Sequence, residues 1–265
     1  MKSNFIHDIK LLKYLICEMC LLAKSGHPSS SLSCSDIIGS LYFLIMKDED
    51  KFILSKGHAA PALYSALMIK NIIPRDYINK LREIDSPLQG HPDISRLPEV
   101  NLTSGALGQG LSFSIGLALS KKIKNEKGYI YCVIGDGEVQ EGQIWEASMF
   151  AGNNDLDNLI VFLDSNDGQS DGKVSEIMPL MPIVDKWKSF GWNVSTINGH
   201  SHDEIINTVN IYKNEKNKRP LLIISKTKKG YISENLTILQ GQHGGSMTDE
   251  VLIKVKKELS ISEEI

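Results

Sequence analysis

The sequence predicts an α/β fold with a doubly wound, mainly parallel sheet that carries helices on both faces. Short apolar runs such as Tyr129–Ile134 and Leu159–Leu163 indicate strands that are buried on both sides, as parallel strands are. Helical patterns separate these runs, and this alternation is typical of βαβ units. Because no internal repeat, low-complexity tract or linker interrupts the pattern, we expect a single domain over residues 1–265.

The first part of the chain is expected to be mostly helical. Apolar residues at helical spacing define the helices, and small polar residues or proline mark where they begin. The expected helices cover residues 7–24, 36–46 and 59–70, with a short strand at 52–54 and a loop-rich stretch at 85–106.

The second part alternates strands with helices. Its apolar runs are short and bounded by glycine, asparagine and aspartate, which favours strands between turns. The expected strands are 129–134, 159–163, 192–197 and 221–225. The expected helices are one that ends near 124, one over about 138–152 and one over 203–216, and a polar loop over 227–245 precedes a helix capped by Thr248.

Composition excludes several classes of protein. The chain has 265 residues, of which 42% are hydrophobic and 23% charged, so it can bury a full core. Its formal charge of −3 gives no reason to expect nucleic acid or an anionic membrane as a partner. No segment has the roughly 18 apolar residues of a membrane span, and the N-terminus lacks a signal-peptide core. We therefore expect a cytoplasmic protein.

Two spacings imitate metal sites without predicting them. Cys17 and Cys20 form a CxxC, but they lie within an apolar helical pattern, where this spacing places both on one face. We therefore interpret them as small buried hydrophobes. His200 and His202 lie in the run 199–203, where a serine or aspartate is expected to cap a helix.

Two turns at the ends of neighbouring strands predict a magnesium site. Gly135-Asp136-Gly137 follows the first of these strands, and Asn166 and Gly168 follow the second. Parallel strands bring such turns to the same edge of a sheet, where open α/β folds bind ligands. Mg²⁺ prefers oxygen ligands, and a diphosphate supplies most of the negative charge itself. We expect the Asp136 carboxylate, the Asn166 amide oxygen and a carbonyl near Gly168 to be the protein ligands.

These residues carry a resemblance to a known family. Gly-Asp-Gly, a helix, a strand and then asparagine resemble the thiamine diphosphate (ThDP) motif, and Glu141-Gly142 resembles transketolases in particular. Four histidine motifs match those of transketolases in the same order across residues 9–260. They are SGHPSS, SKGHAA, QGHPD and QHGGS. The resemblance implies the ThDP-binding fold, with ThDP and Mg²⁺ as cofactors.

The resemblance also implies roles for the histidines and for one carboxylate. His27 and His91 would hydrogen-bond the ketose donor and the aldose acceptor. His58 and His243 would lie near the cofactor diphosphate, with His243 also near substrate. Glu141 would join a carboxylate network at the subunit interface. Imidazoles suit this work because they give and take protons near neutral pH.

The remaining implied roles concern the cofactor. Gly105 and Leu107 lie in the turn that would present backbone to the aminopyrimidine ring. Gly135 and Gly137 would let backbone approach the diphosphate. Asp136, Asn166 and the carbonyl of Gly168 would hold Mg²⁺, as the turn positions also predict.

A transketolase has three domains, and the resemblance covers only the first. The glutamate that activates ThDP belongs to the second domain, and this chain offers no candidate for it. The resemblance therefore implies the N-terminal subunit of a split transketolase, paired with a separately encoded C-terminal subunit in an assembly of two copies of each. Such an enzyme moves a two-carbon ketol unit from a ketose phosphate to an aldose.

Two alternatives remain open at this point. Residues 142–147 are not far from the α subunit of a 2-oxoacid dehydrogenase E1, although the upstream histidine motifs argue against it. A degenerate, non-catalytic regulatory subunit is the other, because Gly168 and Ser170 stand where the family usually has aliphatic residues. Ser170 would bury less apolar surface against the cofactor ring.

Overall fold

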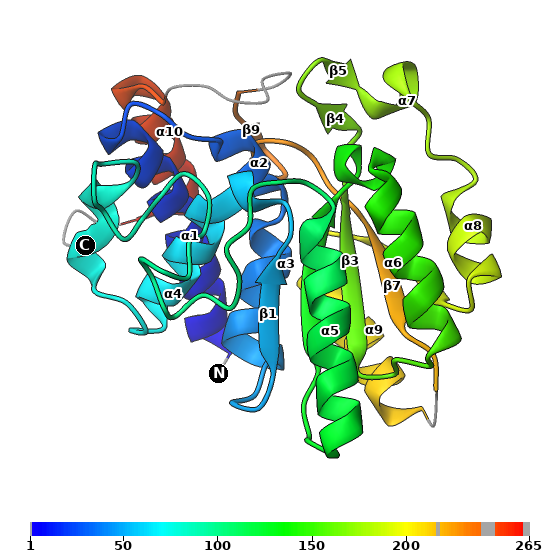
Figure 1. Cartoon of the computed structure of the whole chain (residues 1–265). Helices are drawn as coiled ribbons and strands as arrows, with labels where there is room; N and C mark the ends of the chain where they lie inside the picture. The colour runs from blue at the N-terminus through cyan, green and yellow to red at the C-terminus, as the bar shows by residue number, and fades with distance from the viewer. Residues whose placement is uncertain (1, 216–217, 240–246, 262–265) are drawn as a thin grey trace.

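The computed structural model describes residues 2–215, 218–239 and 247–261. Its centre is a five-stranded parallel sheet of order β1-β2-β3-β7-β6 (Figure 1). The strands are β1 (Lys51–Leu54), β2 (Ile130–Gly135), β3 (Leu159–Ser165), β6 (Asn193–Asn198) and β7 (Leu221–Lys226). This confirms the predicted α/β class with a parallel sheet.

Helices cover both faces of this sheet, because each strand sends alternate side chains to opposite sides. In β2, for example, Tyr131 and Val133 join one apolar core while Cys132 and Ile134 join the other. The first core includes residues of α1 (Lys2–Leu22), α3 (Ser35–Ser40), α4 (Ala60–Ile69), α9 (His202–Asn214) and α10 (Asp249–Leu259).

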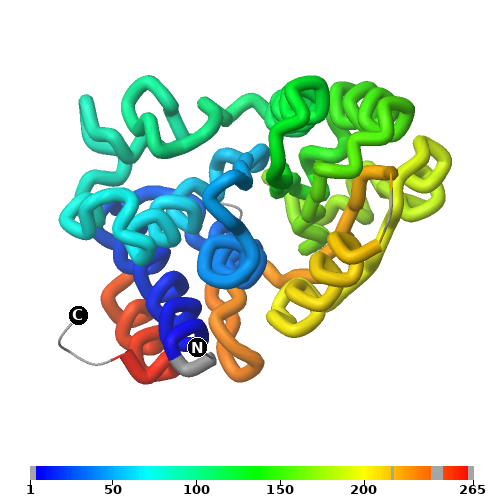
Figure 2. The backbone as a smooth tube through the Cα atoms, turned by 90° about the horizontal axis from the view of Figure 1, so that it is seen from below, coloured from blue at the N-terminus to red at the C-terminus, as the bar shows by residue number. Residues whose placement is uncertain are grey.

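The second core packs under α5 (Gln109–Lys124), α6 (Gly142–Asn153) and α8 (Ile183–Ser189). The two groups of helices are separate in space. Figure 2 shows the N-terminal helices and α10 gathered on one side of the molecule and α5 and α6 on the other. The sheet is therefore doubly wound, as predicted.

The register aligns the two turns that follow β2 and β3. Gly135 pairs with Asp164 at the carboxyl ends of these adjacent strands. The Gly-Asp-Gly turn and the turn that contains Asn166 therefore leave the sheet side by side. The second turn continues into a small hairpin, β4 (Gly168–Gln169) with β5 (Gly172–Lys173), which is followed by α7 (Val174–Ile177).

Several elements differ in extent from the prediction. No helix is expected between residues 24 and 36, but this stretch contains a helix, α2 (Pro28–Ser33), whose residues are all buried. Serine has a weak helix propensity, and here tertiary burial overrides it. The helix expected over 36–46 becomes a π-helix at Leu41–Ile45. The helix expected from residue 138 begins at Gly142, after a 3₁₀ turn at Gly137–Gln140.

The connections hold four further elements. They are two 3₁₀ turns, Gly57–Ala59 and Arg75–Lys80, and the hairpin of β8 (Tyr231–Ser233) and β9 (Leu236–Thr237). This hairpin lies within the stretch expected to be a polar loop. Thr248 caps α10 and Ser201 caps α9, as predicted. Within the described ranges, no helix combines the length and the apolar character needed to cross a bilayer.

Candidate ThDP and magnesium site

A cavity of about 400 Å³ opens at the carboxyl ends of β2 and β3. This size falls in the usual range for small-molecule sites. Of the twelve site residues that the sequence predicts, eleven line it: His27, His58, His91, Gly105, Leu107, Gly135, Asp136, Gly137, Glu141, Asn166 and Gly168. The twelfth, His243, lies outside the described residues. The structure thus brings together residues from distant parts of the chain, while their individual roles stay predictions.

The Asp136 carboxylate is held between the two turns. Its oxygens accept hydrogen bonds from the backbone N–H of Gly137 at 2.9 Å and of Asp167 at 2.5 Å. Only 5% of the residue is exposed. Burial, together with the negative charge of Asp164, raises the pKa of Asp136 to about 6. A cation beside this carboxylate would favour its ionised form.

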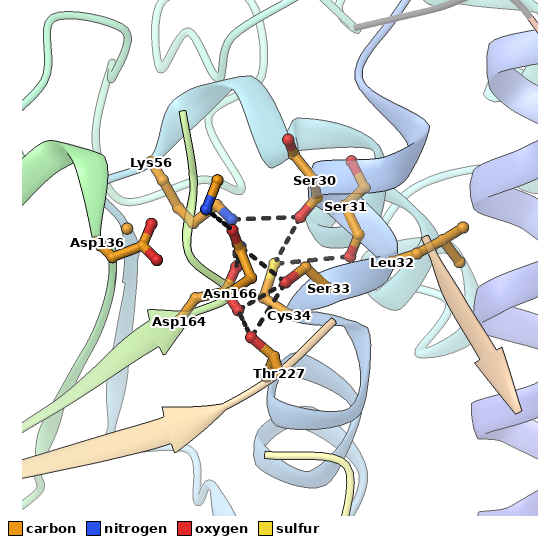
Figure 3. A network of polar contacts seen from close by, with 12 residues as sticks. Ser30, Ser31, Leu32, Ser33, Cys34, Lys56, Asp136, Asp164, Asn166 and Thr227 are labelled. Carbon is orange, nitrogen blue, oxygen red and sulfur yellow. Dashed lines mark hydrogen bonds and ion pairs between the residues drawn. The ribbon is translucent and has the colours of Figure 1, made fainter. Parts of the chain in front are cut away.

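The Asn166 amide is oriented by its neighbours. Its Nδ2 donates to Ser33 Oγ at 2.9 Å and to Asp164 Oδ2 at 3.1 Å, which fixes which atom is nitrogen (Figure 3). Its Oδ1 accepts the backbone N–H of Gly168 at 2.9 Å. Since an amide oxygen has two lone pairs, one remains for a metal ion. The sequence places an asparagine at this turn, and the contacts in the structure show how its amide is oriented.

Behind Asn166, Asp164 is a fully buried carboxylate with four donors around it. Lys56 Nζ lies 2.5 Å from Oδ2, and the hydroxyls of Ser33 and Thr227 donate to Oδ1. Burial alone would raise the pKa of Asp164, but Lys56 holds that pKa below its ordinary value. Burial would also lower the pKa of Lys56, but Asp164 raises it. The pair therefore stays charged, and Figure 3 shows Asp136 facing it.

Glu138 ties three loops of the cavity together. Its carboxylate accepts from Ser55 Oγ at 2.5 Å, from the backbone N–H of Gly108 at 2.9 Å and from that of Gly135 at 3.0 Å. Burial raises the pKa of Glu138 above its ordinary value. Because these donors belong to the segment after β1, the segment before α5 and the end of β2, Glu138 fixes the cavity walls relative to one another.

The histidines form a polar wall around Arg82. The His27 and His58 rings meet edge to face, with centroids 5.4 Å apart, and Arg82 Nη2 lies 3.3 Å from His27 Nδ1. His91 lies beside Gly105, where an added Cβ would be 3.4 Å from the ring. Burial and the positive charge of Arg82 lower the pKa of His91. His91 is therefore a neutral imidazole at neutral pH.

Sequence reasoning missed four charged residues at this site: Lys56, Glu138, Asp164 and Lys229. Lys56 and Lys229 line the cavity, and the Lys229 side chain passes over Gly168, where an added Cβ would be 2.7 Å from its Cε. Burial, and then the positive charge of Lys56, lowers the pKa of Lys229. One signal was available in the sequence: Asp164 lies at the end of a strand, Lys56 and Lys229 follow a strand within a few residues, and Glu138 follows Gly-Asp-Gly.

The donor set fits Mg²⁺ and a diphosphate. One buried carboxylate, one oriented amide oxygen and a carbonyl are hard ligands of the kind that Mg²⁺ takes alongside phosphate oxygens and water. Across the ranges that the structure describes, no group of three or more His, Cys, Asp or Glu side chains could hold a metal ion. Cys17 and Cys20 are buried, as predicted, and burial raises the pKa of each thiol.

Comparisons with known proteins show the family of the chain. The family model for the transketolase, thiamine diphosphate binding domain matches residues 3–264. The chain is 39% identical over 254 residues to the 6-deoxy-6-sulfo-D-fructose transketolase subunit SqwG of Clostridium sp. (strain MSTE9), covering 92% of each chain. It is 37% identical over 252 residues to one subunit of the apulose-4-phosphate transketolase of Phocaeicola vulgatus, covering 92% of this chain and 89% of that one.

A solved structure gives the same result for the fold. The transketolase of Campylobacter jejuni superposes with a TM-score of 0.89 at 30% identity, over 99% of this chain and 44% of that one. The fold is thus that of a ThDP-binding domain, and the chain belongs to the transketolase family. Its coverage of nearly all of two transketolase subunits, against under half of a transketolase chain, identifies it with the N-terminal subunit of a split transketolase.

Proposed function

We propose that this chain binds the diphosphate of ThDP through a Mg²⁺ ion and, with a C-terminal partner subunit, transfers a two-carbon ketol unit from a ketose to an aldose. The observation that supports it best is the meeting of the Asp136 and Asn166 turns at one cavity. Asp136, Asn166 Oδ1 and the Gly168 carbonyl would hold the metal. When bound, ThDP supplies the nucleophilic carbon that accepts the two-carbon unit.

Residues of this chain would hold the cofactor in place. Gly135 and Gly137 line the cavity without side chains, so the backbone can lie close to the diphosphate. Lys56 and Lys229 place positive charge at the same end of the cavity as Asp136. His58 would also lie near the diphosphate, and Gly105 and Leu107 would line the aminopyrimidine. We keep His243 in the proposal as a further contact, on the resemblance of its motif alone.

His27 and His91 are proposed to bind the sugars. Because a guanidinium can only donate, His27 Nδ1 accepts from Arg82, and we propose that the ring donates to a sugar hydroxyl through Nε2–H. His91 is neutral, so its ring offers one donor and one acceptor to sugar hydroxyls. A neutral imidazole can also take a proton from a hydroxyl as the carbon–carbon bond of the donor breaks. These two residues are the proposed general acid–base groups of this chain.

The partner is proposed to close the cavity. The Glu141 side chain is exposed at the cavity rim, and Leu107 is 37% exposed beside it. An exposed carboxylate and an exposed leucine at a cofactor cavity are suited to contact a second chain. We propose that this second chain is a C-terminal transketolase subunit, in an assembly with two copies of each, and that Glu141 lies at an interface there.

The names of two relatives support a proposal for the substrate class. Their names specify 6-deoxy-6-sulfo-D-fructose in one case and apulose 4-phosphate in the other. Both are sugars with an anionic group, a sulfonate or a phosphate. We propose that the donor of this enzyme is likewise a ketose that carries a sulfonate or a phosphate.

Reconstitution tests the proposal directly. The chain is mixed with a C-terminal transketolase subunit, and ThDP binding is followed by calorimetry with and without Mg²⁺. We expect Mg²⁺-dependent binding, ketol transfer by the pair, and loss of both in Asp136→Ala. Asp185→Asn, an exposed change on α8, is the matched control. Decarboxylation of pyruvate by the pair would favour the dehydrogenase alternative, and failure of the pair to bind ThDP would favour a degenerate subunit.

A further inference from the structure

A buried polar cluster lies beside the cavity, on the other side of the loop that follows β7. Its centre is Asp36 of α3, which is 1% exposed. Lys13 Nζ lies 3.0 Å from this carboxylate, and His200 Nδ1 and His202 Nε2 each lie 2.8 Å from it. Burial alone would raise the pKa of Asp36, but Lys13 and the two histidines hold that pKa below its ordinary value. Asp36 is therefore a fixed negative charge.

His200 links this charge to the loop. Its Nδ1 contacts Asp36, and its Nε2 lies 2.9 Å from the backbone N of Lys228. Because a backbone N–H can only donate, Nε2 accepts, and the ring is neutral with its proton on Nδ1. The ring is also stacked on Tyr231, with centroids 3.6 Å apart and planes at 20°. Both nitrogens of a buried imidazole are thus used, one on a carboxylate and one on the loop.

Hydrogen bonds anchor the loop on both sides of Lys229, the residue that lines the cavity. The Thr227 hydroxyl donates to Asp164, the Lys228 N–H donates to His200, and the Gly230 N–H donates to the Ser29 carbonyl at 2.9 Å. Lys229 lies between these anchors and lines the cavity beside Gly168. A loop held at three successive points directs the residue between them.

We propose that His200 is a positioning residue for the cofactor site. Held by Asp36, it fixes the backbone of residues 227–230 so that Lys229 lies against the Gly168 turn, where the diphosphate would bind. This inference rests on the proposed function, because it needs an anion in the cavity. The inference also explains the pair His200 and His202, whose spacing imitates a metal site. In the structure, their hydrogen-bond partners are the Asp36 carboxylate and the backbone N–H of Lys228.

Two substitutions separate the two bonds of the ring. In His200→Asn, the amide nitrogen stands where Nδ1 stood and can still donate to Asp36, but no atom reaches the Lys228 N–H. In His200→Gln, the amide oxygen reaches the position of Nε2 and can accept from Lys228. Both variants lose the stack on Tyr231, so a purely structural role would affect them alike.

The measurement is the dissociation constant of ThDP at saturating Mg²⁺ for each variant paired with the C-terminal subunit. We expect His200→Asn to bind ThDP about tenfold more weakly, a change of about 1.4 kcal/mol, with kcat at saturating ThDP near that of the parent enzyme. His200→Gln should recover most of this affinity. His202→Ala, which removes a contact to Asp36 but none to the loop, is the control and should bind ThDP as the parent does.

A second measurement needs no cofactor. Hydrogen exchange of the Lys228 amide in the chain alone should accelerate in His200→Asn and stay slow in His200→Gln. Equal ThDP affinity of His200→Asn and the parent enzyme would overturn the inference, as would equal weakness of the two variants. If the parent pair binds no ThDP, the proposed function fails, and unchanged exchange of the Lys228 amide would then refute the positioning role independently.

Discussion

Replacing Asp136 with asparagine should stabilise the metal-free chain at neutral pH while it abolishes Mg²⁺-dependent binding of ThDP. The carboxylate lies in a buried turn beside Asp164, and its pKa is raised from 3.8 to about 6. The folded chain therefore holds this proton more tightly than the unfolded chain does. As the pH rises from about 4 to above 6, the folded state loses this advantage, and the free energy of unfolding falls.

The size of the effect follows from the two pKa values. A difference of about 2 pKa units corresponds to ~3 kcal/mol at pH 7. Asparagine removes this term, but its side chain has one oxygen where Asp136 has two. One of the N–H groups of Gly137 and Asp167 would lose its acceptor, at a cost of ~1 kcal/mol. The net expectation is a metal-free variant that is ~2 kcal/mol more stable than the parent chain at pH 7.

Urea unfolding in the presence of EDTA measures this difference. The parent chain should lose stability between pH 4.5 and 7, and the Asp136→Asn chain should lose less over the same interval, since only the Asp136 contribution is removed. A variant that is less stable than the parent at pH 7 without metal, or that shows the same pH dependence, would refute the electrostatic reasoning. A residue that binding requires often destabilises the unliganded protein, so that replacing it raises the free energy of unfolding.

Three further predictions concern the same network. Divalent cation binding, followed by calorimetry on the reconstituted pair, should weaken about tenfold per pH unit below about pH 6, because protonated Asp136 is a poor ligand; constant affinity down to pH 5 would contradict this. Lys56→Met should destabilise the chain by ~3–5 kcal/mol in urea, because it leaves Asp164 charged and buried, whereas Lys173→Met removes only an exposed pair and should have little effect. Glu138→Gln should lower the free energy of unfolding by ~1–3 kcal/mol through lost acceptor capacity, and an unchanged unfolding midpoint would show that these bonds contribute nothing.

The meeting of the Asp136 and Asn166 turns could be predicted because their residues obey local rules. Asp136 and Asn166 each follow an apolar strand, and parallel packing of consecutive strands places both turns at one edge of the sheet. Strand type, the doubly wound arrangement and the caps at Ser201 and Thr248 follow from patterns that span about ten residues. No long-range information was needed for any of them.

The supporting contacts could not be predicted in this way. Lys56 and Asp164 are 108 residues apart in sequence, and nothing local shows that a buried lysine meets a buried aspartate. The same holds for Glu138, whose three donors come from three separate segments. Such contacts depend on how the elements pack, and a charged residue in a turn is otherwise expected to be solvated.

The helix α2 illustrates the same limit for secondary structure. Its sequence, Pro28–Ser33, has four serines, and serine competes with helix formation by hydrogen-bonding nearby backbone. In the structure, Ser31 Oγ donates to nearby backbone, the carbonyl of His27, but Ser33 Oγ donates to the distant Asp164. Burial of the whole helix and this tertiary partner make the helix favourable, and both are visible only in the folded chain.

The most direct measurement is the position of a divalent ion in crystals of the reconstituted pair with ThDP and Mn²⁺. Mn²⁺ takes the same oxygen ligands as Mg²⁺, and its anomalous scattering locates it without ambiguity. We expect one peak per copy of this chain, beside Asp136, Asn166 Oδ1 and the Gly168 carbonyl, where diphosphate oxygens and water would supply the remaining ligands. A bound cofactor whose metal lies on other residues of this chain, or on the partner, would contradict it.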